Sequence, residues 1–325
     1  MKTRRLGKTE LKVSEVVLGG GWVGGFFINS DFEIMEKAFK KSLDSGINMI
    51  DTAETYSCGK SEKNIGILLN KIKHNKIFVS SKAKLDHNNK ETIISQLDRK
   101  LDQSLKRLDK SSIELYQLHN RIEIIEKSDT FTAKQILKKG GVLDSLEKLK
   151  SEGRIKNIGI TALGNINQIK TILSSEGFDT AQVYYNLLNP SASFKNRNNW
   201  NDHDFSGLID DCLKYDIGII CIRIFAAGIL ATDIRHGREI PITVGISEVE
   251  QERRVKKIIN LTKDQIGTRA QIALRYGLSN KSISCIVVGF EKLDHLNEII
   301  EAKNEGPLEE DFIEEINKLH ASNFN

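Results

Sequence analysis

The chain has 325 residues, of which 28% are charged and 39% hydrophobic, a balance typical of a globular protein with a large core. The formal net charge of +4 comes from interleaved basic and acidic residues, which argues against nucleic-acid or membrane binding. The four cysteines form no C-x-x-C pair, and no histidine has zinc-ligand spacing, so we expect reduced thiols, no metal and a cytoplasmic location. The N-terminus lacks an apolar signal sequence, and the most apolar stretch, residues 217–230, is too short to span a bilayer.

The first predicted element is a small β-hairpin at residues 4–14, where polar and apolar residues alternate around a Gly-Lys turn. A short strand at residues 16–18 then runs into the sequence G-G-G-W-V-G at residues 19–24. This sequence fits the G-x-G-x-x-G pattern of dinucleotide-binding folds, but residues 25–30 intervene before any helical periodicity begins. We therefore interpret it as a loop and not as a Rossmann phosphate-binding turn.

Further along the chain, amphipathic helices alternate with short apolar strands. The expected strands are residues 16–18, 48–51, 77–82, 114–119, 155–161, 181–185, 218–224 and 283–289. The expected helices are residues 31–45, 61–71, 90–108, 132–151, 165–175, 205–214, 250–262, 269–278 and 293–303. One more amphipathic helix, residues 309–320, lies outside this pattern.

Strands that alternate with helices pair in parallel, and eight such units in one chain predict a closed (β/α)₈ TIM barrel. We expect residues 1–325 to form this single α/β domain, with the N-terminal hairpin and the C-terminal helix outside the barrel. Functional groups of such barrels gather at the carboxyl ends of the strands. The long non-helical stretches at residues 186–201 and 226–246 follow the sixth and seventh strands, and we expect them to select the substrate.

Three successive strands end in reactive side chains. Asp51 ends the second strand, Lys82 the third and His119 the fourth, while Tyr56 lies on the loop after the second strand. Each residue alone is compatible with a structural role, such as a rim salt bridge or a strand-end histidine. Together, at the same end of one barrel, they predict a catalytic site.

The chemistry of these side chains is coherent. A free tyrosine, with a pKa of about 10, exchanges protons poorly at neutral pH. An ammonium about 4 Å from the phenol favours the phenolate by ~4 kcal/mol at an effective dielectric of ~20, which corresponds to up to ~3 pKa units. Asp51 would keep Lys82 charged and oriented, Tyr56 would act as general acid or base, and His119 would orient a substrate oxygen.

These residues and their surroundings resemble the aldo-keto reductase family over nearly the whole chain. The similar segments are R-R-L-G-K-T-E-L-K-V-S, D-T-A-E-T-Y, S-S-K, L-Y-Q-L-H-N, G-R-I-K-N-I-G-I-T and V-V-G-F-E-K-L-D-H-L. The resemblance implies an NAD(P)-dependent oxidoreductase that transfers hydride between the nicotinamide and a small aldehyde or ketone, or the corresponding alcohol. It implies Asp51, Tyr56, Lys82 and His119 as the catalytic tetrad, with Trp22 and His119 beside the substrate. We expect a monomer or a weak homo-oligomer.

The resemblance also assigns residues around the nicotinamide. Gln182 corresponds to the glutamine that binds the carboxamide, and Thr161 stands where many members carry a serine. The end of the seventh strand, I-R-I-F-A-A-G, lacks the tyrosine that usually stacks on the nicotinamide. We expect Arg223 or Phe225 to take its place, beside Gly228.

The adenosine-phosphate segment corresponds to residues 289–298, where we expect Gly289, Lys292 and His295 to contact the cofactor. His295 replaces the usual Arg or Gln, and Glu291 stands where Ser or Arg is frequent. A carboxylate disfavours a 2′-phosphate, whereas Lys292 favours one. The cofactor is therefore NADP or NAD, and Glu291 shifts the expectation toward NAD.

The alanine after Thr161 and the missing stacking tyrosine resemble the sugar dehydrogenases of the family, so the expected substrate is sugar-like or an aliphatic aldehyde. One alternative is a cofactor-binding regulatory or sensor protein on the same fold, with little turnover. Another is a Schiff-base lyase or aldolase that uses Lys82, which would need an uncharged amine. The sequence leaves the substrate, the reaction direction and the oligomeric state open.

Overall fold

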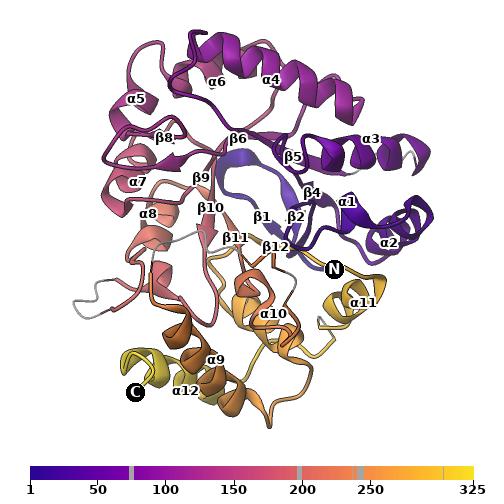
Figure 1. Cartoon of the computed structure of the whole chain (residues 1–325), viewed down its shortest axis with the longest axis vertical. Helices are drawn as coiled ribbons and strands as arrows, with labels where there is room; N and C mark the ends of the chain where they lie inside the picture. Colours follow the sequence, from indigo (N-terminus) through magenta and orange to yellow (C-terminus); the bar gives the residue numbers. More distant parts are fainter. Residues whose placement is uncertain (73–76, 196–199, 236, 240–244, 303) are drawn as a thin grey trace.

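The structure is a computed structural model that describes residues 1–72, 77–195, 200–235, 237–239, 245–302 and 304–325. Within this part of the chain, eight parallel strands close into a barrel in the order β3-β4-β5-β6-β9-β10-β11-β12, with helices around it (Figure 1). The barrel strands are β3 (Val16–Gly19), β4 (Met49–Asp51), β5 (Phe78–Ala83), β6 (Leu115–Leu118), β9 (Ile158–Thr161), β10 (Thr180–Tyr184), β11 (Gly218–Ile222) and β12 (Cys285–Val288). The predicted (β/α)₈ barrel is confirmed.

Five of the helices begin where a side chain caps their first backbone amides. The side chains of Thr92, Asn165 and Ser247 cap α4, α7 and α9, and Thr132 and Thr268 form capping boxes at α5 and α10. The helices are α1 (Phe26–Asn29), α2 (Phe32–Asp44), α3 (Lys60–Ile72), α4 (Ile93–Leu108), α5 (Ala133–Leu137), α6 (Val142–Ser151), α7 (Ile166–Leu173), α8 (Leu208–Lys214), α9 (Glu248–Thr262), α10 (Arg269–Ser279), α11 (Leu293–Glu301) and α12 (Glu310–Ala321).

The amino end of the barrel is covered by the predicted hairpin, which β1 (Thr3–Arg5) and β2 (Lys12–Ser14) form around the 3₁₀ turn η1 (Gly7–Thr9). Leu6 and Val13 of this segment are buried, and they pack against apolar side chains at the barrel floor. These floor residues are Val17, Met49, Leu115, Ile220 and Cys285. Because one end of the barrel is filled in this way, the opposite end is the one available for a site.

The prediction of a single helix at residues 132–151 is wrong, because α5 and α6 are separate helices. Gly140 has a φ of 70°, and a Cβ at Gly141 would lie 2.5 Å from the carbonyl oxygen of Gln135. These two glycines therefore permit a sharp break that a longer side chain would oppose. The stretch at residues 25–30 also differs from the prediction, because Phe26–Asn29 forms the short helix α1.

The loop after β6 contains short strands that the sequence did not predict, β7 (Arg121–Ile122) and β8 (Thr130–Phe131), which pair in parallel. The predicted C-terminal helix is confirmed as α12, which lies beside α9 and away from the barrel (Figure 1). Among the described helices, none combines the length and apolarity needed to cross a bilayer. Parts of the predicted loops and helices, at positions 196–199, 236, 240–244 and 303, lie outside the described residues.

Candidate active site

The carboxyl ends of β4, β5 and β6 bring three of the predicted catalytic residues together. Asp51 ends β4, Lys82 lies near the end of β5, and His119 follows β6. Adjacent parallel pairing, with Asp51 opposite Ser80 on β5, sets these side chains at one height in the ring. Tyr56 approaches them from the loop between β4 and α3.

Lys82 is the centre of this cluster, with its side chain fully buried. Its Nζ donates to Asp51 Oδ2 at 2.6 Å and to the carbonyl oxygen of Thr52 at 2.7 Å, and it lies 3.5 Å from the hydroxyl of Tyr56. Burial lowers the pKa of this amine, but Asp51 and Tyr56 together raise it by more, so that its net pKa is above the ordinary value. Lys82 is therefore a charged ammonium within hydrogen-bond reach of the phenol.

Asp51 is held by a hydroxyl from β5 and by side-chain amides from β6 and β10. Its Oδ1 accepts from Ser80 Oγ at 2.8 Å, from Gln182 Nε2 at 2.9 Å and from Gln117 Nε2 at 3.3 Å. Ser80 and Gln117 were not predicted, although both are polar residues inside buried strands, which indicates that they need hydrogen-bond partners. These contacts fix the carboxylate that orients the lysine.

His119 faces Tyr56, with ring centroids 5.6 Å apart in an edge-on arrangement. Its Nδ1 lies 3.3 Å from the hydroxyl of Thr55, a contact that the sequence did not predict. Burial and the nearby charges of Lys82 and Lys84 lower the pKa of His119 to about 3. The imidazole is therefore neutral at ordinary pH, and it retains one N–H that can donate a hydrogen bond.

The glycine-rich loop after β3 forms a wall of the same site. The backbone amide of Gly20 donates to the carbonyl oxygen of Asp51 at 2.7 Å, and a Cβ at Gly21 would lie 3.8 Å from the Tyr56 ring. Trp22 follows and is 39% exposed. The structure thus places the predicted substrate residue Trp22 on the loop that passes beside the tyrosine.

Two of the residues expected around the nicotinamide lie on adjacent strands, Thr161 at the end of β9 and Gln182 in the middle of β10. Thr161 is buried, and its Oγ1 has no hydrogen-bond partner among the described residues, so it has capacity for a ligand. Gln182 is paired with Thr161 across β9 and β10, and its amide nitrogen binds Asp51. The orphaned hydroxyl fits the carboxamide of a nicotinamide, whereas the amide nitrogen of Gln182 already has a protein partner.

The segment after β11 has an unusual backbone. Arg223, Ala226 and Ala227 have φ values of 61°, 45° and 63°, the left-handed region that non-glycine residues rarely adopt. Phe225 is partly buried, and Gly228, with a φ of 106°, has no atom within 4 Å of the position of a Cβ. The expected contacts Arg223, Phe225 and Gly228 therefore lie on one strained turn at the barrel mouth.

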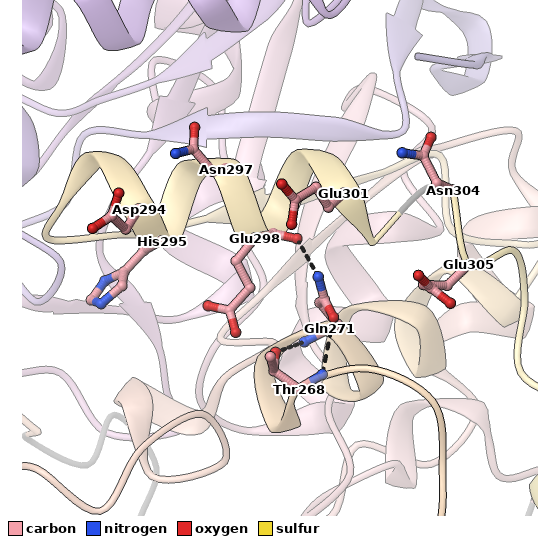
Figure 2. Close-up of a pocket in the computed structure, with 9 residues that line it drawn as sticks. All are labelled: Thr268, Gln271, Asp294, His295, Asn297, Glu298, Glu301, Asn304 and Glu305. Atoms are coloured by element: carbon pink, nitrogen blue, oxygen red, sulfur yellow. Dashed lines mark hydrogen bonds between the residues drawn. The ribbon is translucent and has the colours of Figure 1, made fainter.

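The β12–α11 segment borders a surface pocket of about 670 Å³ between α10 and α11 (Figure 2). The pocket is lined by Thr268, Gln271, Asp294, His295, Asn297, Glu298, Glu301, Asn304 and Glu305. The predicted contact His295 lies in this lining, while Gly289 and Lys292 are exposed just before α11. Glu291 pairs with Arg238 of the β11–α9 segment at 2.9 Å, a contact that no sequence pattern indicates.

In the described part of the chain, no group of His, Cys, Asp and Glu has the arrangement of a metal site.

The closed ring of eight parallel strands with helices around it places the molecule in the class of (β/α)₈-barrel proteins. Residues 15–321 match the profile of the Aldo/keto reductase family, and the chain belongs to this family. It is 24% identical to the uncharacterized oxidoreductase YqkF of Bacillus subtilis over 96% of this chain and 94% of that protein. It is 24% identical to L-galactose dehydrogenase of Arabidopsis thaliana over 94% of this chain and 89% of that protein. The fold is similar to that of aldo-keto reductase AKR11C1 from Bacillus halodurans in its holo form, with a TM-score of 0.76 and 21% identity over 98% of this chain and 96% of that structure.

Proposed function

We propose that this protein transfers hydride between a nicotinamide cofactor and a small aldehyde or ketone, or the corresponding alcohol, with Tyr56 as the proton donor and acceptor. The observation that carries the proposal is the position of the charged amine of Lys82, 2.6 Å from Asp51 and 3.5 Å from the Tyr56 hydroxyl. An ammonium at this distance stabilises a phenolate, which is the product when the tyrosine gives its proton away.

In the direction of reduction, a nicotinamide held at the barrel mouth would supply hydride to the carbonyl carbon. The oxygen gains negative charge as hydride arrives, and the hydroxyl of Tyr56 transfers its proton to that oxygen. Lys82 stabilises the resulting phenolate, and Asp51 keeps the amine in place. The neutral imidazole of His119 donates a hydrogen bond that orients the carbonyl oxygen beside the phenol. Oxidation of an alcohol runs through the same positions in reverse.

The charge on Lys82 also weighs against the lyase or aldolase alternative. A Schiff base requires an uncharged amine that attacks a carbonyl carbon. Here the amine donates to a carboxylate and to a backbone carbonyl, and its raised pKa keeps it protonated. The same geometry serves well for electrostatic stabilisation of a phenolate.

We propose that Thr161 and Gln182 hold the nicotinamide amide, with Phe225 and Gly228 beside the ring and Trp22 next to the substrate. The support for Thr161 is its buried, unpartnered hydroxyl at the rim end of β9. Phe225 offers an aromatic side chain on the strained turn after β11. Gly228 offers open space beside its backbone, which suits close approach by a ligand.

For the adenosine half, we propose that the cofactor lies along Gly289, Lys292 and His295 and that NAD(H) is preferred over NADP(H). Glu291 stands in this segment, and four of the nine residues that line the adjoining pocket are carboxylates (Figure 2). Two like unit charges about 4 Å apart repel by ~4 kcal/mol at an effective dielectric of ~20, so a 2′-phosphate near Glu291 is disfavoured. Arg238 pairs with Glu291 and neutralises part of its negative charge. We therefore expect a preference for NAD(H) that is smaller than this repulsion alone would give.

The cofactor preference is measured by quenching of tryptophan fluorescence on titration with NADH and NADPH. We expect NADH to bind at least about tenfold more tightly, because ~1.4 kcal/mol of repulsion is enough for that ratio. Glu291→Ser is expected to lower the ratio of the Kd for NADPH to the Kd for NADH. Glu248→Ser, which removes the same charge at the exposed start of α9, is the control and should leave this ratio unchanged. Tighter binding of NADPH by the unmodified protein would overturn the preference.

The activity itself is tested by a screen of small aldehydes and sugars with both cofactors. Relatives of this chain include L-glyceraldehyde 3-phosphate reductase and NADH-specific methylglyoxal reductase of Escherichia coli, so glyceraldehyde 3-phosphate and methylglyoxal belong in the screen beside galactose. We expect measurable turnover with at least one of these compounds. Tight cofactor binding without turnover on any of them would instead support the regulatory or sensor function.

A further inference from the structure

The neutral imidazole of His119 can carry its proton on either ring nitrogen, and the two forms differ in what they offer a substrate. With the proton on Nε2, that nitrogen donates a hydrogen bond and Nδ1 accepts one, whereas the roles are exchanged with the proton on Nδ1. Nδ1 contacts Thr55, and Nε2 has no hydrogen-bond partner in the described part of the chain. Nε2 is therefore the nitrogen left for a substrate oxygen, and it must carry the proton to donate to a carbonyl.

Thr55 is the residue that can select between the two forms. Its hydroxyl oxygen lies 3.3 Å from Nδ1 of His119, and this hydroxyl has no second hydrogen-bond partner among the described residues. Its O–H is therefore available to donate to the ring. When Nδ1 accepts that hydrogen bond, it is unprotonated, and the proton of the neutral imidazole lies on Nε2.

The loop that carries Thr55 is fixed by the residues on both sides of it. Glu54 Oε1 accepts from the backbone amide of Lys84, just after β5, at 3.0 Å and from Lys100 Nζ on α4 at 2.7 Å. On the other side, the backbone amide of Tyr56 closes a turn by donating to the carbonyl oxygen three residues earlier at 3.1 Å. The side chain of Thr55 is exposed, so these neighbours, and not its own burial, hold its hydroxyl beside the imidazole.

We propose that Thr55 is a positioning residue for His119: its hydroxyl donates to Nδ1 and thereby places the imidazole proton on Nε2, where it can donate to the carbonyl oxygen of the substrate. This inference rests on the proposed carbonyl chemistry at Tyr56. The hydrogen bond from Nε2 strengthens as hydride arrives and the oxygen gains negative charge. Thr55 therefore acts on the reaction rate through the imidazole. A threonine with only a structural role in the loop would leave the position of this proton unchanged.

The position of the proton is measured by ¹⁵N NMR, because protonated and unprotonated ring nitrogens have different chemical shifts. The protein is labelled with ¹⁵N-histidine, and His119→Gln identifies the signals of this residue among those of the seven histidines. At about pH 7.5, where the imidazole is neutral, we expect the proton on Nε2 in the unmodified protein and in Thr55→Ser. Thr55→Val should show a measurable share of the form protonated on Nδ1. Thr3→Val, exposed on β1 at the amino end of the barrel, is the control.

Kinetic measurements test whether the position of the proton matters for the reaction. We expect the single-turnover rate of cofactor oxidation with a carbonyl substrate to fall about fivefold or more in Thr55→Val, the usual effect of one lost hydrogen bond. The Kd for NADH should change by less than about twofold. Thr55→Ser should recover most of the rate, since it keeps the hydroxyl.

Three results would overturn the proposal: a proton on Nδ1 in the unmodified protein, the same proton position in Thr55→Val as in the unmodified protein, or an unchanged rate in Thr55→Val. The NMR result does not depend on turnover. A protein that reduces none of the carbonyls tested, but whose Nε2 proton depends on Thr55, would therefore support the positioning by Thr55 and contradict the chemistry proposed at Tyr56.

Discussion

Lys82 carries a full charge where its side chain is fully buried, and its neighbours compensate for the lost hydration. Asp51 supplies the counter-charge and the carbonyl of Thr52 a further acceptor, at 2.6 Å and 2.7 Å. A buried ion pair of this kind contributes little net stability, since desolvation offsets the attraction between the charges. The ion pair instead orients the ammonium of Lys82 toward Tyr56. Three further side chains hold the Asp51 carboxylate in place, those of Ser80, Gln117 and Gln182.

His119 predicts a pH dependence of stability. Its pKa is about 3 in the folded protein, against an ordinary value of 6.5 that we take for the unfolded chain. Between these values the unfolded chain binds the extra proton, so stability falls as pH is lowered and is unaffected above about pH 7. From this residue alone, the free energy of unfolding should fall by about 2 kcal/mol between pH 7.5 and pH 5.

Urea denaturation of the unmodified protein and of His119→Gln at both pH values measures this contribution. Between pH 7.5 and pH 5, the free energy of unfolding of His119→Gln should fall by about 2 kcal/mol less than that of the unmodified protein. An identical loss in both proteins would show that the imidazole is not shielded from protonation.

The clustering of Asp51, Lys82 and His119 could be predicted because the strand ends of a parallel barrel meet at one rim, and Tyr56 follows the first of these strands on a loop. Their partners were harder to predict. Ser80 and Gln117 are polar residues in buried strands, so their burial could be anticipated, but their common partner Asp51 depends on strand register. The Arg238–Glu291 pair joins residues 53 positions apart on different loops, and no local pattern indicates it.

Among the elements, the connections differ from prediction more than the strands and helices do. Alternating strands and amphipathic helices are encoded in the local spacing of apolar residues. The break between α5 and α6 and the β7–β8 pair depend on glycine geometry and on tertiary contacts instead. Gly164 is the clearest example, since its φ is 120° and a Cβ there would lie 2.0 Å from the carbonyl oxygen of Ile122 on β7.

We expect Gly164→Ala to destabilise the fold by about 1–3 kcal/mol, because the added methyl group forces either β7 or the end of β9 to move. Gly153→Ala is the matched control. Its φ of 74° is also positive, but no atom lies within 4 Å of the added carbon, so only the backbone cost applies. Thermal or urea unfolding measures the free energy of unfolding of both variants. Equal losses of stability in Gly164→Ala and Gly153→Ala would mean that the close approach of residue 164 to Ile122 does not constrain the fold.

In the whole molecule, the amino end of the barrel has a structural role and the carboxyl end holds the candidate site. The hairpin fills the amino end with Leu6 and Val13, while the candidate site occupies the carboxyl end. Leu6→Ala should therefore lower the free energy of unfolding by about 2–5 kcal/mol, the usual cost of a cavity in a core. Steady-state kcat/KM under native conditions should stay within about twofold, since well-separated sites act independently. A large loss of kcat/KM in a protein that remains folded would contradict this separation.

The barrel as a whole was predictable because eight repeats of one local pattern leave few topologies. The loops over its carboxyl end were not, because long-range contacts position them. Arg254 is fully buried on α9, where it donates to Asn201 and contacts the rings of Trp200 and Phe324. A loop, a helix and the C-terminal segment thus meet at one arginine whose sequence neighbours suggest an ordinary surface helix.

The central claim is that the phenol of Tyr56, beside the charged amine of Lys82, moves the proton in a hydride-transfer reaction. The most direct measurement is the single-turnover rate of cofactor oxidation with a carbonyl substrate, for the unmodified protein and for Tyr56→Phe, alongside the Kd for NADH. We predict that the rate falls by about 10²-fold or more, the usual contribution of a general acid, while the Kd changes by less than about twofold. A Tyr56→Phe protein that oxidises the cofactor at the unmodified rate would contradict the account.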